Sequence, residues 1–541
     1  MSSKLRHAAV LAIATTAVAT GAAAAGAATP RWVLHVQNYP GGISGGVRAY
    51  LDPGISGATP GLSPVVGPLS SAAPALDNVQ VNSLDSSPPV PQNETQVVAE
   101  PGHPLVAVAA ANDYVNGGSQ IYRTADGGRT WTTQFRSSAV QETGDFCGGG
   151  GDPALTYSLR DRAFYFAQLC FFRNHIESEI EVLRSTDGGQ TWSPSLRGAY
   201  PVSNFRPNLG GFTPTVFYDK DQITVDNNAS SPFYGRLYVT YTKFHILANG
   251  FSDYCPINLS YTDNIDPNGD GDLGDSVWHK TNVVPNNSGG NGTGPSANQG
   301  SQPVVDNKGG VDISYMSEDC NDAFDPAILF SRSTDGGVTF GAQRRIDKPG
   351  QWKDNPNVND ILPPKKGRAP ASTSAPLVFN PTDKSLDYIV QNNINRAVSG
   401  ADISFTKSMD YGRTWSNMKF VSVNAAGQPA KRDQFLPWMA VSPDGSLHAI
   451  WFDNRNDPNN LLIETFQGDS TDGGTTWKNT DISSVPWNPN RSFFSSGAFF
   501  GDYNGIAAAP GKLYPVWTDG RNTPGPPNGQ TDIFTNVETG P

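Results

Sequence analysis

Short apolar stretches alternate with turn residues from Glu94 onward, and the same unit recurs along the chain. Each copy begins with a short apolar strand, turns at Gly or Asp, and continues through a second strand rich in aromatic residues. This pattern predicts repeated β-hairpins. The seven copies read ETQVVAEPGHPLVAVAAAND, GDPALTYSLRDRAFYFAQLC, DQITVDNNASSPFYGRLYVTYT, SQPVVDNKGGVDISYMSED, SAPLVFNPTDKSLDYIVQNN, QFLPWMAVSPDGSLHAIWFDNR and GDYNGIAAAPGKLYPVWTDGR.

Hairpins that recur at intervals of tens of residues predict a β-propeller, in which each four-stranded blade packs its faces against its neighbours. We therefore expect an all-β fold with seven blades of four antiparallel strands, and six blades is the alternative. The 57 glycines and 43 prolines, with 10% aromatic residues, agree with short strands joined by many turns.

An eight-residue box follows five of the copies. It reads TADGGRTW, STDGGQTW, STDGGVTF, SMDYGRTW and STDGGTTW, and the interval between its second and third occurrences is about twice the others. That interval contains SYTDNIDPNGDGDLGDSVWHK at residues 260–280. We interpret this segment as the same hairpin with its turn expanded by an acidic insertion.

The composition of the box suits a turn between two antiparallel strands. Its Asp can accept hydrogen bonds from backbone N–H groups of the turn, its glycines adopt positive φ angles, and the final aromatic residue covers the turn. No nucleophile stands beside a base, so we interpret the box as scaffold. The structural residues are Asp126, Trp131, Asp187, Trp192, Asp335, Phe340, Asp410, Trp415, Asp472 and Trp477.

These boxes resemble the Asp box, or BNR repeat, of sialidases and related β-propellers. The five near-complete matches lie within residues 124–477. The resemblance implies that the boxes lie on the hairpins between the third and fourth strands of their blades, at the rim opposite the active face. Any chemistry would then belong to the mouth of the central channel.

The first 28 residues form a predicted signal peptide. Basic Lys4, Arg6 and His7 precede an apolar run from Ala8 to Val18, which is followed by small residues. We therefore predict a secreted, extracellular protein. The apolar run is too short to span a bilayer, and no other apolar segment reaches about 18 residues, so no transmembrane segment is expected.

Residues 29–92 are rich in Pro, Gly, Ser and Ala, which is typical of a linker or N-terminal arm. Only WVLHVQ and NVQVNSL have a strand-like pattern there. The propeller is expected to occupy residues 93–541, and its last copy has room for only three strands. We expect a strand from the arm, within Asn78 to Leu84, to complete that blade and close the ring.

The four cysteines are expected to pair in an oxidising compartment. Cys147 and Cys170 are placed to meet across the mouth of a hairpin, and Cys255 and Cys320 lie in loops of successive repeats; free buried thiols are the alternative. The net charge of -12 and the pI near 5.0 argue against nucleic acid as a partner, because phosphate binding needs clustered Lys and Arg.

Candidate active-site residues lie where first strands start and second strands end, since both meet at one face of a propeller. The resemblance to sialidases implies three arginines that bind a carboxylate, a Tyr paired with Glu as nucleophile, and an Asp as acid/base catalyst. Arg455 and Arg521 match two arginines, and Tyr503 or Tyr514 the nucleophile. The F/Y-R-I-P signature is absent, and FRPN at 205–208 follows the second box, so no third arginine is assigned.

Two other interpretations stay open at this face. The D-x-R motifs at 453–455 and 519–521 can form ion pairs that join neighbouring blades. The face is acidic with few cations, which favours a neutral glycan, cleaved by one carboxyl as acid and another as base or nucleophile. The candidate catalytic residues are Tyr503, Asp502, Asp453 and Asp519, and the candidate substrate-binding residues are Arg455, Arg521, Asp113 and Asp152.

The acidic insertion predicts a Ca²⁺ site, because it presents hard oxygen donors at alternating positions with glycines between them. It resembles the first half of an EF-hand loop, although Val277 stands where a bidentate Glu is expected; a solvated acidic turn is the alternative. No zinc site or organic cofactor is indicated. The candidate ligands are Asp266, Asn268, Asp270, Asp272 and Asp275.

Two functions of different classes follow. The first is a secreted, sialidase-like glycoside hydrolase or glycan-processing propeller that acts at the mouth of the central channel. The second is a non-catalytic propeller that binds a glycan, a glycoconjugate or a protein through the same mouth, with the Asp boxes purely structural.

Overall fold

The computed structural model describes most of the propeller and part of the N-terminal arm. The predicted signal peptide and Cys147 lie outside the described residues. The described residues are 29–39, 42–51, 78–82, 91–114, 118–136, 149–171, 175–192, 198–206, 208, 210–284, 298–317, 320–321, 327–355, 360–371, 375–494, 497–522 and 531–537.

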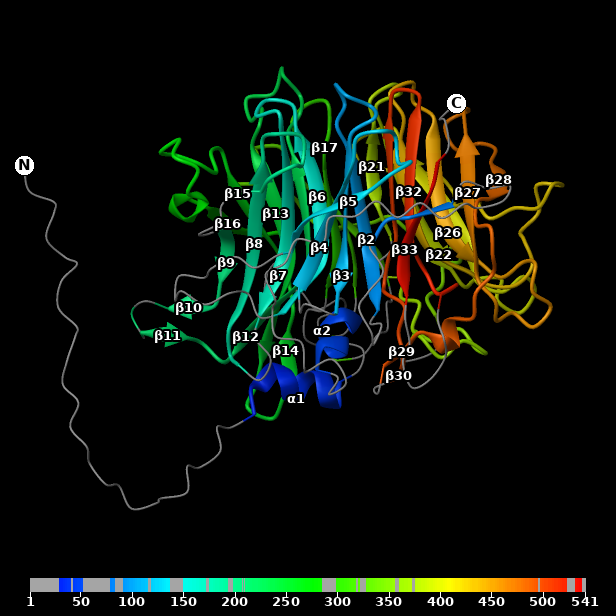
Figure 1. Cartoon of the computed structure of the whole chain (residues 1–541), viewed down its shortest axis with the longest axis horizontal. Helices are drawn as coiled ribbons and strands as arrows, with labels where there is room; N and C mark the ends of the chain where they lie inside the picture. The colour runs from blue at the N-terminus through cyan, green and yellow to red at the C-terminus, as the bar shows by residue number, and fades with distance from the viewer. Residues whose placement is uncertain are drawn as a thin grey trace, which may run out of the picture.

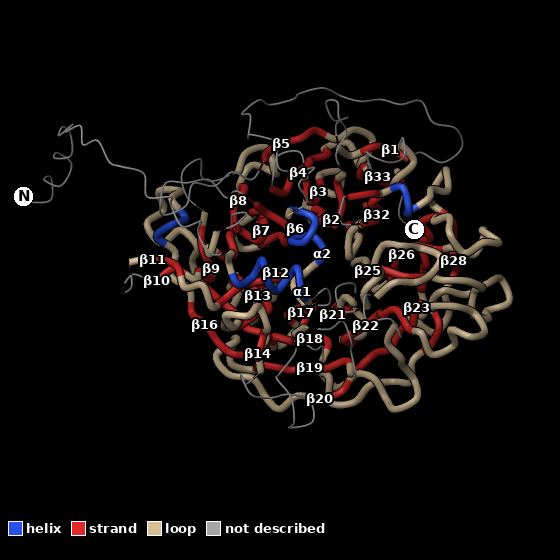
Figure 2. Tube along the Cα trace, turned by 90° about the horizontal axis from the view of Figure 1, so that it is seen from below, coloured by secondary structure: helices blue, strands red, loops and turns tan. Residues whose placement is uncertain are grey.

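Seven four-stranded antiparallel blades stand around a ring, as Figures 1 and 2 show. The first strand of each blade contacts the first strands of the neighbouring blades, so these strands line the centre. The predicted seven-bladed, all-β architecture is confirmed. The first four blades are β2 (Gln92–Ala99), β3 (Ala107–Asp113), β4 (Gly118–Thr124) and β5 (Thr132–Arg136); β6 (Gly149–Ser158), β7 (Ala163–Phe171), β8 (Ser178–Ser185) and β9 (Ala199–Ser203); β12 (Val216–Val225), β13 (Leu237–Ile246), β15 (Ile257–Thr262) and β16 (His279–Asn282); and β17 (Gln299–Val305), β18 (Val311–Met316), β19 (Ile328–Ser333) and β20 (Arg344–Arg345).

The third blade contains the acidic insertion as the turn between β15 and β16, which pair antiparallel.

The last three blades and the smaller elements complete the fold. They are β21 (Leu377–Asn380), β22 (Ser385–Asn392), β23 (Asp402–Ser408) and β24 (Lys419–Phe420); β25 (Gln434–Val441), β26 (Leu447–Asp453), β27 (Glu464–Ser470) and β28 (Lys478–Asp481); β31 (Gly505–Ala509), β32 (Lys512–Asp519), β33 (Asp532–Asn536) and β1 (Asn78–Gln80); with α1 (Arg31–Asn38), α2 (Gly45–Tyr50), β10 (Phe205–Arg206), β11 (Gly211–Phe212), β14 (Ser252–Tyr254), η2 (Leu273–Asp275), η3 (Pro489–Arg491), β29 (Phe493–Phe494) and β30 (Gly497–Ala498).

The ring closes through the N-terminal arm. Strand β1 pairs antiparallel with β33, so the outer strand of the seventh blade comes from the opposite end of the chain. Asn82 adds side-chain hydrogen bonds to Gln92 and Asp532, each at 2.9 Å. The arm thus supplies a strand from the region in which the sequence indicated one, and β33 is not left as a bare sheet edge.

The same arm contains a difference from the sequence prediction. The WVLHVQ stretch, which we expected to be strand-like, lies in helix α1. Trp32, Val33 and Val36 are buried together, and the Trp32 ring packs on Phe171 and Phe217. Residues at i, i+1 and i+4 share one face of a helix, whereas they would alternate between the faces of a strand. Packing on the propeller therefore selects the helix.

Bulges interrupt the first strands near their starts. The pairing register shifts in β2, β6, β12, β17 and β25. At each shift one residue has positive φ, and Gly501 before β31 has it too; these residues are Glu94, Asp152, Lys220, Gly300, Leu436 and Gly501. A bulge redirects a side chain that regular pleating would point elsewhere. The bulges therefore determine which groups face the channel mouth.

Each Asp box forms a hydrogen-bonded turn between the third and fourth strands of its blade. In the fifth blade, Asp410 accepts hydrogen bonds from the backbone N–H of Thr414 at 2.8 Å and from its hydroxyl at 2.6 Å. Burial alone would raise the pKa of Asp410, but these hydrogen bonds lower it overall. In the first blade the box turn lies beside the β2–β3 turn, where Gly127 N–H donates to Leu105 O. The boxes thus lie at the opposite strand ends from the bulges.

The boxes also hold neighbouring blades together. A Cβ added to Gly412 would lie 2.1 Å from the ring of Phe330 in the preceding blade, and one added to Gly474 would lie 2.2 Å from Phe405. The box aromatics Trp415 and Trp477 pack edge-on against these same two rings. The second box glycine is therefore required by the close approach between blades as well as by its positive φ.

We expect Gly412→Ala to lower the free energy of unfolding by about 2–4 kcal/mol, since the methyl group meets a positive φ and the Phe330 ring. Gly427→Ala is the matched control, because Gly427 also has positive φ but open space around its Cβ position. Urea unfolding measures both variants. Equal losses in the two would mean that contact between the blades contributes nothing at this position.

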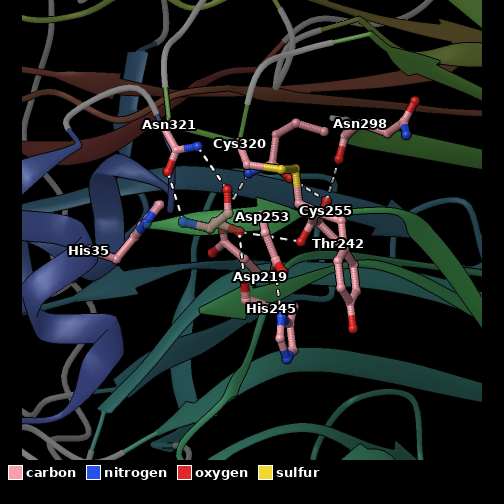
Figure 3. The surroundings of a disulfide bond; sticks show 12 residues. His35, Asp219, Thr242, His245, Asp253, Cys255, Asn298, Cys320 and Asn321 are labelled. Carbon is pink, nitrogen blue, oxygen red and sulfur yellow. Dashed lines mark hydrogen bonds and ion pairs between the residues drawn. A yellow bond between two sulfur atoms is a disulfide. The ribbon is translucent and has the colours of Figure 1, made fainter. Parts of the chain in front are cut away.

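A disulfide joins the third and fourth blades. Cys255 and Cys320 are bonded, with their Cα atoms 5.8 Å apart, so this predicted pair is confirmed. Figure 3 shows it beside Asn321, whose side-chain amide exchanges two hydrogen bonds of 2.9 Å with the backbone of Ser252. No cysteine is free among the described residues, and the Cys147–Cys170 bond stays a prediction because Cys147 lies outside them.

Candidate functional site

Seven polar side chains meet at the channel mouth, and we call this group the hub. They come from the bulged starts of β2, β6 and β12 and from the segment before β31. Each is at most 1% exposed to solvent. The hub consists of Glu94, Asp152, Asp219, Lys220, Asp221, Asp502 and Tyr503.

Contacts across blades tie the hub together. Glu94 accepts hydrogen bonds from the Asn112 amide at 2.5 Å and from Asp502 N–H at 3.1 Å, and its carboxyl group is hydrogen-bonded to Asp152. Lys220 N–H donates to Asp152 at 3.1 Å. The Lys220 ammonium lies 3.6 Å from the centroid of the Tyr503 ring, a cation–π contact. Blades one, two, three and seven therefore share one polar network.

Several hub atoms have no hydrogen-bond partner among the described residues. They are both carboxylate oxygens of Asp221, the Lys220 ammonium and the Tyr503 hydroxyl. A buried polar group without a partner costs about 1–3 kcal/mol, and more when it is charged. Unpartnered donors and acceptors that face one another from different blades are typical of a site that binds a polar ligand.

Positive charge at the hub comes from one lysine and two arginines. Arg368, from the segment between the fourth and fifth blades, lies 3.2 Å from Asp502. Arg48 comes from helix α2. Burial and the nearby charge of Arg368 lower the pKa of Arg48 to about 10, although the charge of Asp502 acts to raise it. Five carboxyl groups thus face three cations, so the site is acidic overall.

The hub carboxyl groups hold protons more tightly than exposed ones. Burial, then the charges of Asp152 and Asp502, raises the pKa of Glu94 well above its usual value. Burial and Asp152 also raise the pKa of Asp219 to about 7, and they raise the pKa of Asp221 well above its usual value. The raised pKa favours the protonated form of Glu94, while Asp502 forms an ion pair with Arg368.

The raised pKa of Asp219 predicts that stability falls as pH rises. The folded state binds this proton more tightly than the unfolded chain, whose Asp pKa is near 3.8, so the contribution is complete below pH 3.8 and lost through pH 7. The loss is at most about 4 kcal/mol. We expect melting temperature to fall between pH 5 and 8, and Asp219→Asn to reduce the fall. An identical pH dependence in the variant would contradict the assignment.

The N-terminal arm covers the hub. Ser44 donates from its backbone N–H and from its hydroxyl to Asp219, both at 2.9 Å, and Gly45 N–H donates to Asp502 at 3.2 Å. A Cβ on Gly46 would lie 2.8 Å from Glu94. Figure 2 shows α1 and α2 on this face of the ring, with α2 beside β2 and β6.

The structure brings together three of the residues selected from the sequence, namely Asp152, Asp502 and Tyr503. It places the two D-x-R motifs elsewhere. Arg455 binds Asp453 at 2.6 Å and donates to Val423 O of the preceding blade at 3.0 Å. The Asp453 carboxylate is also bound by the Trp451 indole N–H.

The second D-x-R motif repeats this arrangement. Arg521 binds Asp519 at 2.7 Å and donates to the hydroxyl of Ser484, which follows the sixth blade, at 2.7 Å. The Trp517 indole N–H also donates to the Asp519 carboxylate, at 3.0 Å. Both motifs thus join neighbouring blades, as the alternative interpretation had it. Asp113 likewise lies apart from the hub, beside Gln92.

The side chains of the acidic insertion bind one another, Arg184 and backbone N–H groups of their own turn. Asp266 is paired with Arg184 at 2.7 Å, and the Asn268 amide donates to Asp275 at 2.8 Å. Asp270 and Asp272 accept backbone N–H groups of the same turn. Within the described residues, no three His, Cys, Asp or Glu side chains are grouped to hold a metal ion. Calcium binding stays a prediction, and melting with and without chelator tests it.

A cavity of about 500 Å³ lies at the box rim between the fourth and fifth blades. Its lining includes Lys308, Arg332 and Tyr411. Asp306 and Asp312 pair with Arg332, so part of its positive charge is already balanced. The cavity and the hub share no residue, and we place the chemistry at the hub because the buried unpartnered groups are there.

Sequence analysis missed Lys220, Asp219 and Arg368. The bulges place Lys220 in β12 at the position that Asp152 has in β6, because both residues have positive φ at the register shift of their strands. A pattern of alternating apolar and polar residues does not reveal an extra residue in a strand. The position expected to face the mouth is therefore displaced by one residue. The DKD triplet at 219–221, a cluster of charge within the buried strand β12, was the available signal. Nothing in the sequence around Arg368 marks it.

Comparison with known proteins supports the repeat assignment. Residues 183–194 match the family model described as BNR/Asp-box repeat. The chain is a β-propeller that contains an Asp-box repeat. No curated protein sequence matches the chain. Among the described residues, the helices of the propeller and its arm are all too short or too polar to cross a membrane.

Solved structures similar to this propeller include three with TM-scores below 0.5. A protein of unknown function from Dyadobacter fermentans has 15% identity over 72% of this chain and 96% of that chain, with a TM-score of 0.44. A Hadza microbial sialidase has 12% identity, 80% and 73% coverage, and a TM-score of 0.43. An α-L-arabinofuranosidase from Fusarium graminearum has 12% identity, 75% and 98% coverage, and a TM-score of 0.44. Function does not transfer at this level of similarity.

Proposed function

We propose that this propeller is an exported glycoside hydrolase that cleaves a neutral glycan at the hub. The observation that carries the proposal is a buried cluster of carboxyl groups in which the pKa of Glu94 is raised and Asp502 is paired with Arg368. Beside them lie polar atoms of Asp221, Lys220 and Tyr503 that have no hydrogen-bond partner among the described residues. Glycoside hydrolysis requires one protonated and one ionised carboxyl group on opposite sides of the scissile bond. The predicted signal peptide at residues 1–28 supports export.

Three roles follow from the geometry. Burial and the neighbouring carboxyls raise the pKa of Glu94, which suits it to protonate the leaving oxygen. Asp502, which forms an ion pair with Arg368, is suited to act as base or nucleophile. Asp221 and Lys220 are available to accept from and donate to sugar hydroxyls.

A neutral substrate fits the charge balance better than sialic acid. Of the two arginines near the hub, Arg368 is paired with Asp502 and Arg48 belongs to the arm. Arg455 and Arg521 lie between blades, so they do not complete an arginine triad there. An anionic sugar would instead approach five carboxyl groups.

A substrate panel tests the proposal. Neutral aryl glycosides and sialosides are offered to the wild-type chain and to Gly46→Leu, in which a side chain meets Glu94 and moves the arm away. We expect the Gly46→Leu variant, with or without the wild-type chain, to cleave a neutral glycoside. We expect neither chain to cleave a sialoside. Absence of turnover of every substrate by both chains would reject the hydrolase and leave a non-catalytic binding propeller.

A further inference from the structure

One described segment of the N-terminal arm lies across the proposed substrate site. The segment of residues 42–51, which we call the plug, contains helix α2 and packs across the channel mouth. Ile43, Val47 and Tyr50 are each at most 1% exposed. Because the plug buries the hub groups, a glycan and the plug cannot occupy the hub at the same time.

The contacts of the plug match those that a sugar would make. It offers Asp219 a hydroxyl and an N–H, and it offers Asp502 an N–H, all as donors to carboxyl groups. The Tyr50 ring lies 4.6 Å from the ring of Tyr114, and its hydroxyl donates to Gly118 O at 2.8 Å. A neutral saccharide likewise presents several hydroxyl donors and an apolar ring face.

Two glycines allow this close approach. A Cβ on Gly45 would lie 2.5 Å from the Phe499 ring and 3.2 Å from Asp502, and a Cβ on Gly46 would lie 2.8 Å from Glu94 and 3.0 Å from Asn112. Backbone alone can therefore reach the carboxyl groups.

The fit of the plug is incomplete, which is expected of a removable segment. The Nε and Nη2 atoms of Arg48 are buried without a hydrogen-bond partner among the described residues. The guanidinium also faces Arg368, and burial with this repulsion lowers its pKa. Asp221 and Lys220 stay unpartnered beneath the plug as well. Undocking would return these groups to water and recover part of that cost.

We propose that the plug is an intramolecular inhibitor that occupies the saccharide site of the hub and must undock before a neutral glycan binds. This inference rests on the proposed function for the identity of the competing ligand. Occupation of the hub by the plug itself is testable without any glycan.

Two variants of the full chain undock the plug by opposite means. Gly46→Leu adds bulk against Glu94. Ser44→Pro with Tyr50→Ala instead removes the Ser44 donors and the Tyr50 ring. The Ser44 φ of -51 is close to that of proline, so this substitution fits the local backbone. Gly102→Leu is the control, because a Cβ there meets nothing within 4 Å.

The probe is a synthetic peptide with the sequence of residues 42–51, GISGGVRAYL. We expect it to bind both undocked variants and to bind neither wild type nor Gly102→Leu, as measured by fluorescence anisotropy. Deuterium exchange of residues 42–51 should rise in the two variants only. Peptide binding to no chain, or exchange that is equal in all chains, would overturn the inference.

Turnover separates this inference from the proposed function. If both hold, kcat/KM on a neutral glycoside is at least about tenfold higher in the undocked variants, which is about 1.4 kcal/mol. Peptide binding without turnover in any chain would keep the plug and reject the hydrolase. Equal turnover in all chains without peptide binding would keep the hydrolase and reject the plug.

Discussion

Glu94→Gln is expected to lower kcat/KM on a neutral glycoside by about 1,000-fold, because the amide keeps the shape of Glu94 but cannot donate its acid proton; general acid catalysis contributes about 10²–10⁴-fold. The loss should fall mainly on kcat, since the interaction is made in the transition state. Steady-state kinetics in the Gly46→Leu chain measures it with the plug displaced.

Glu181→Gln is the matched control for this prediction. Glu181 is also fully buried, and burial raises its pKa to about 7, but it is bound to Gln168 in the second blade and is not part of the hub. We expect its kinetics to stay within about twofold of the parent chain. A similar loss in both variants would indicate general damage to the fold, and no loss for Glu94→Gln would remove Glu94 from the mechanism.

Replacement of the Cys255–Cys320 bond is expected to lower the free energy of unfolding by about 4 kcal/mol. The bond closes a loop with a sequence separation of 65 residues, and the chain-entropy model gives about this value for such a loop. Cys255→Ser and Cys320→Ser, singly and together, are compared by urea unfolding under oxidising conditions.

The double variant separates the bond from its surroundings. Because either single replacement already breaks the bond, the double replacement should add less than about 1 kcal/mol. Additive losses from the two single variants would mean that each serine acts through local packing. Wild-type stability in all three would show that the contacts of Asn321 hold the blades without the bond.

The fold was largely predictable because it is repeated. Seven copies of one hairpin pattern and five boxes fix the architecture, since a period-2 pattern with turn residues specifies strands wherever one face is buried. WVLHVQ in α1 was not predictable in this way, because its eight-residue helix takes its conformation from packing on Phe171 and Phe217 rather than from its own pattern.

The candidate site was predictable only in outline. Strand starts located Asp152, Asp502 and Tyr503, because the topology alone brings these positions to the channel mouth. The bulge at Lys220 shifts its strand by one residue, which no alternation pattern records. The roles of Arg455 and Arg521 could not be predicted from the sequence either. An arginine at the end of a second strand can bind a substrate or a neighbouring blade, and only its contacts in the structure distinguish these two roles.

The central claim is that chemistry belongs to the hub and scaffolding to the Asp boxes. The most direct measurement is kcat/KM on a neutral glycoside for Asp502→Asn and Asp472→Asn, both in the Gly46→Leu chain. These two variants make the same chemical change, one at the hub and one at an Asp box. Burial alone would raise the pKa of Asp472, but the hydrogen bonds of its box lower it to about 2. The account predicts at least about a 100-fold loss for Asp502→Asn and an unchanged value for Asp472→Asn. Equal losses, or a loss confined to Asp472→Asn, would contradict it.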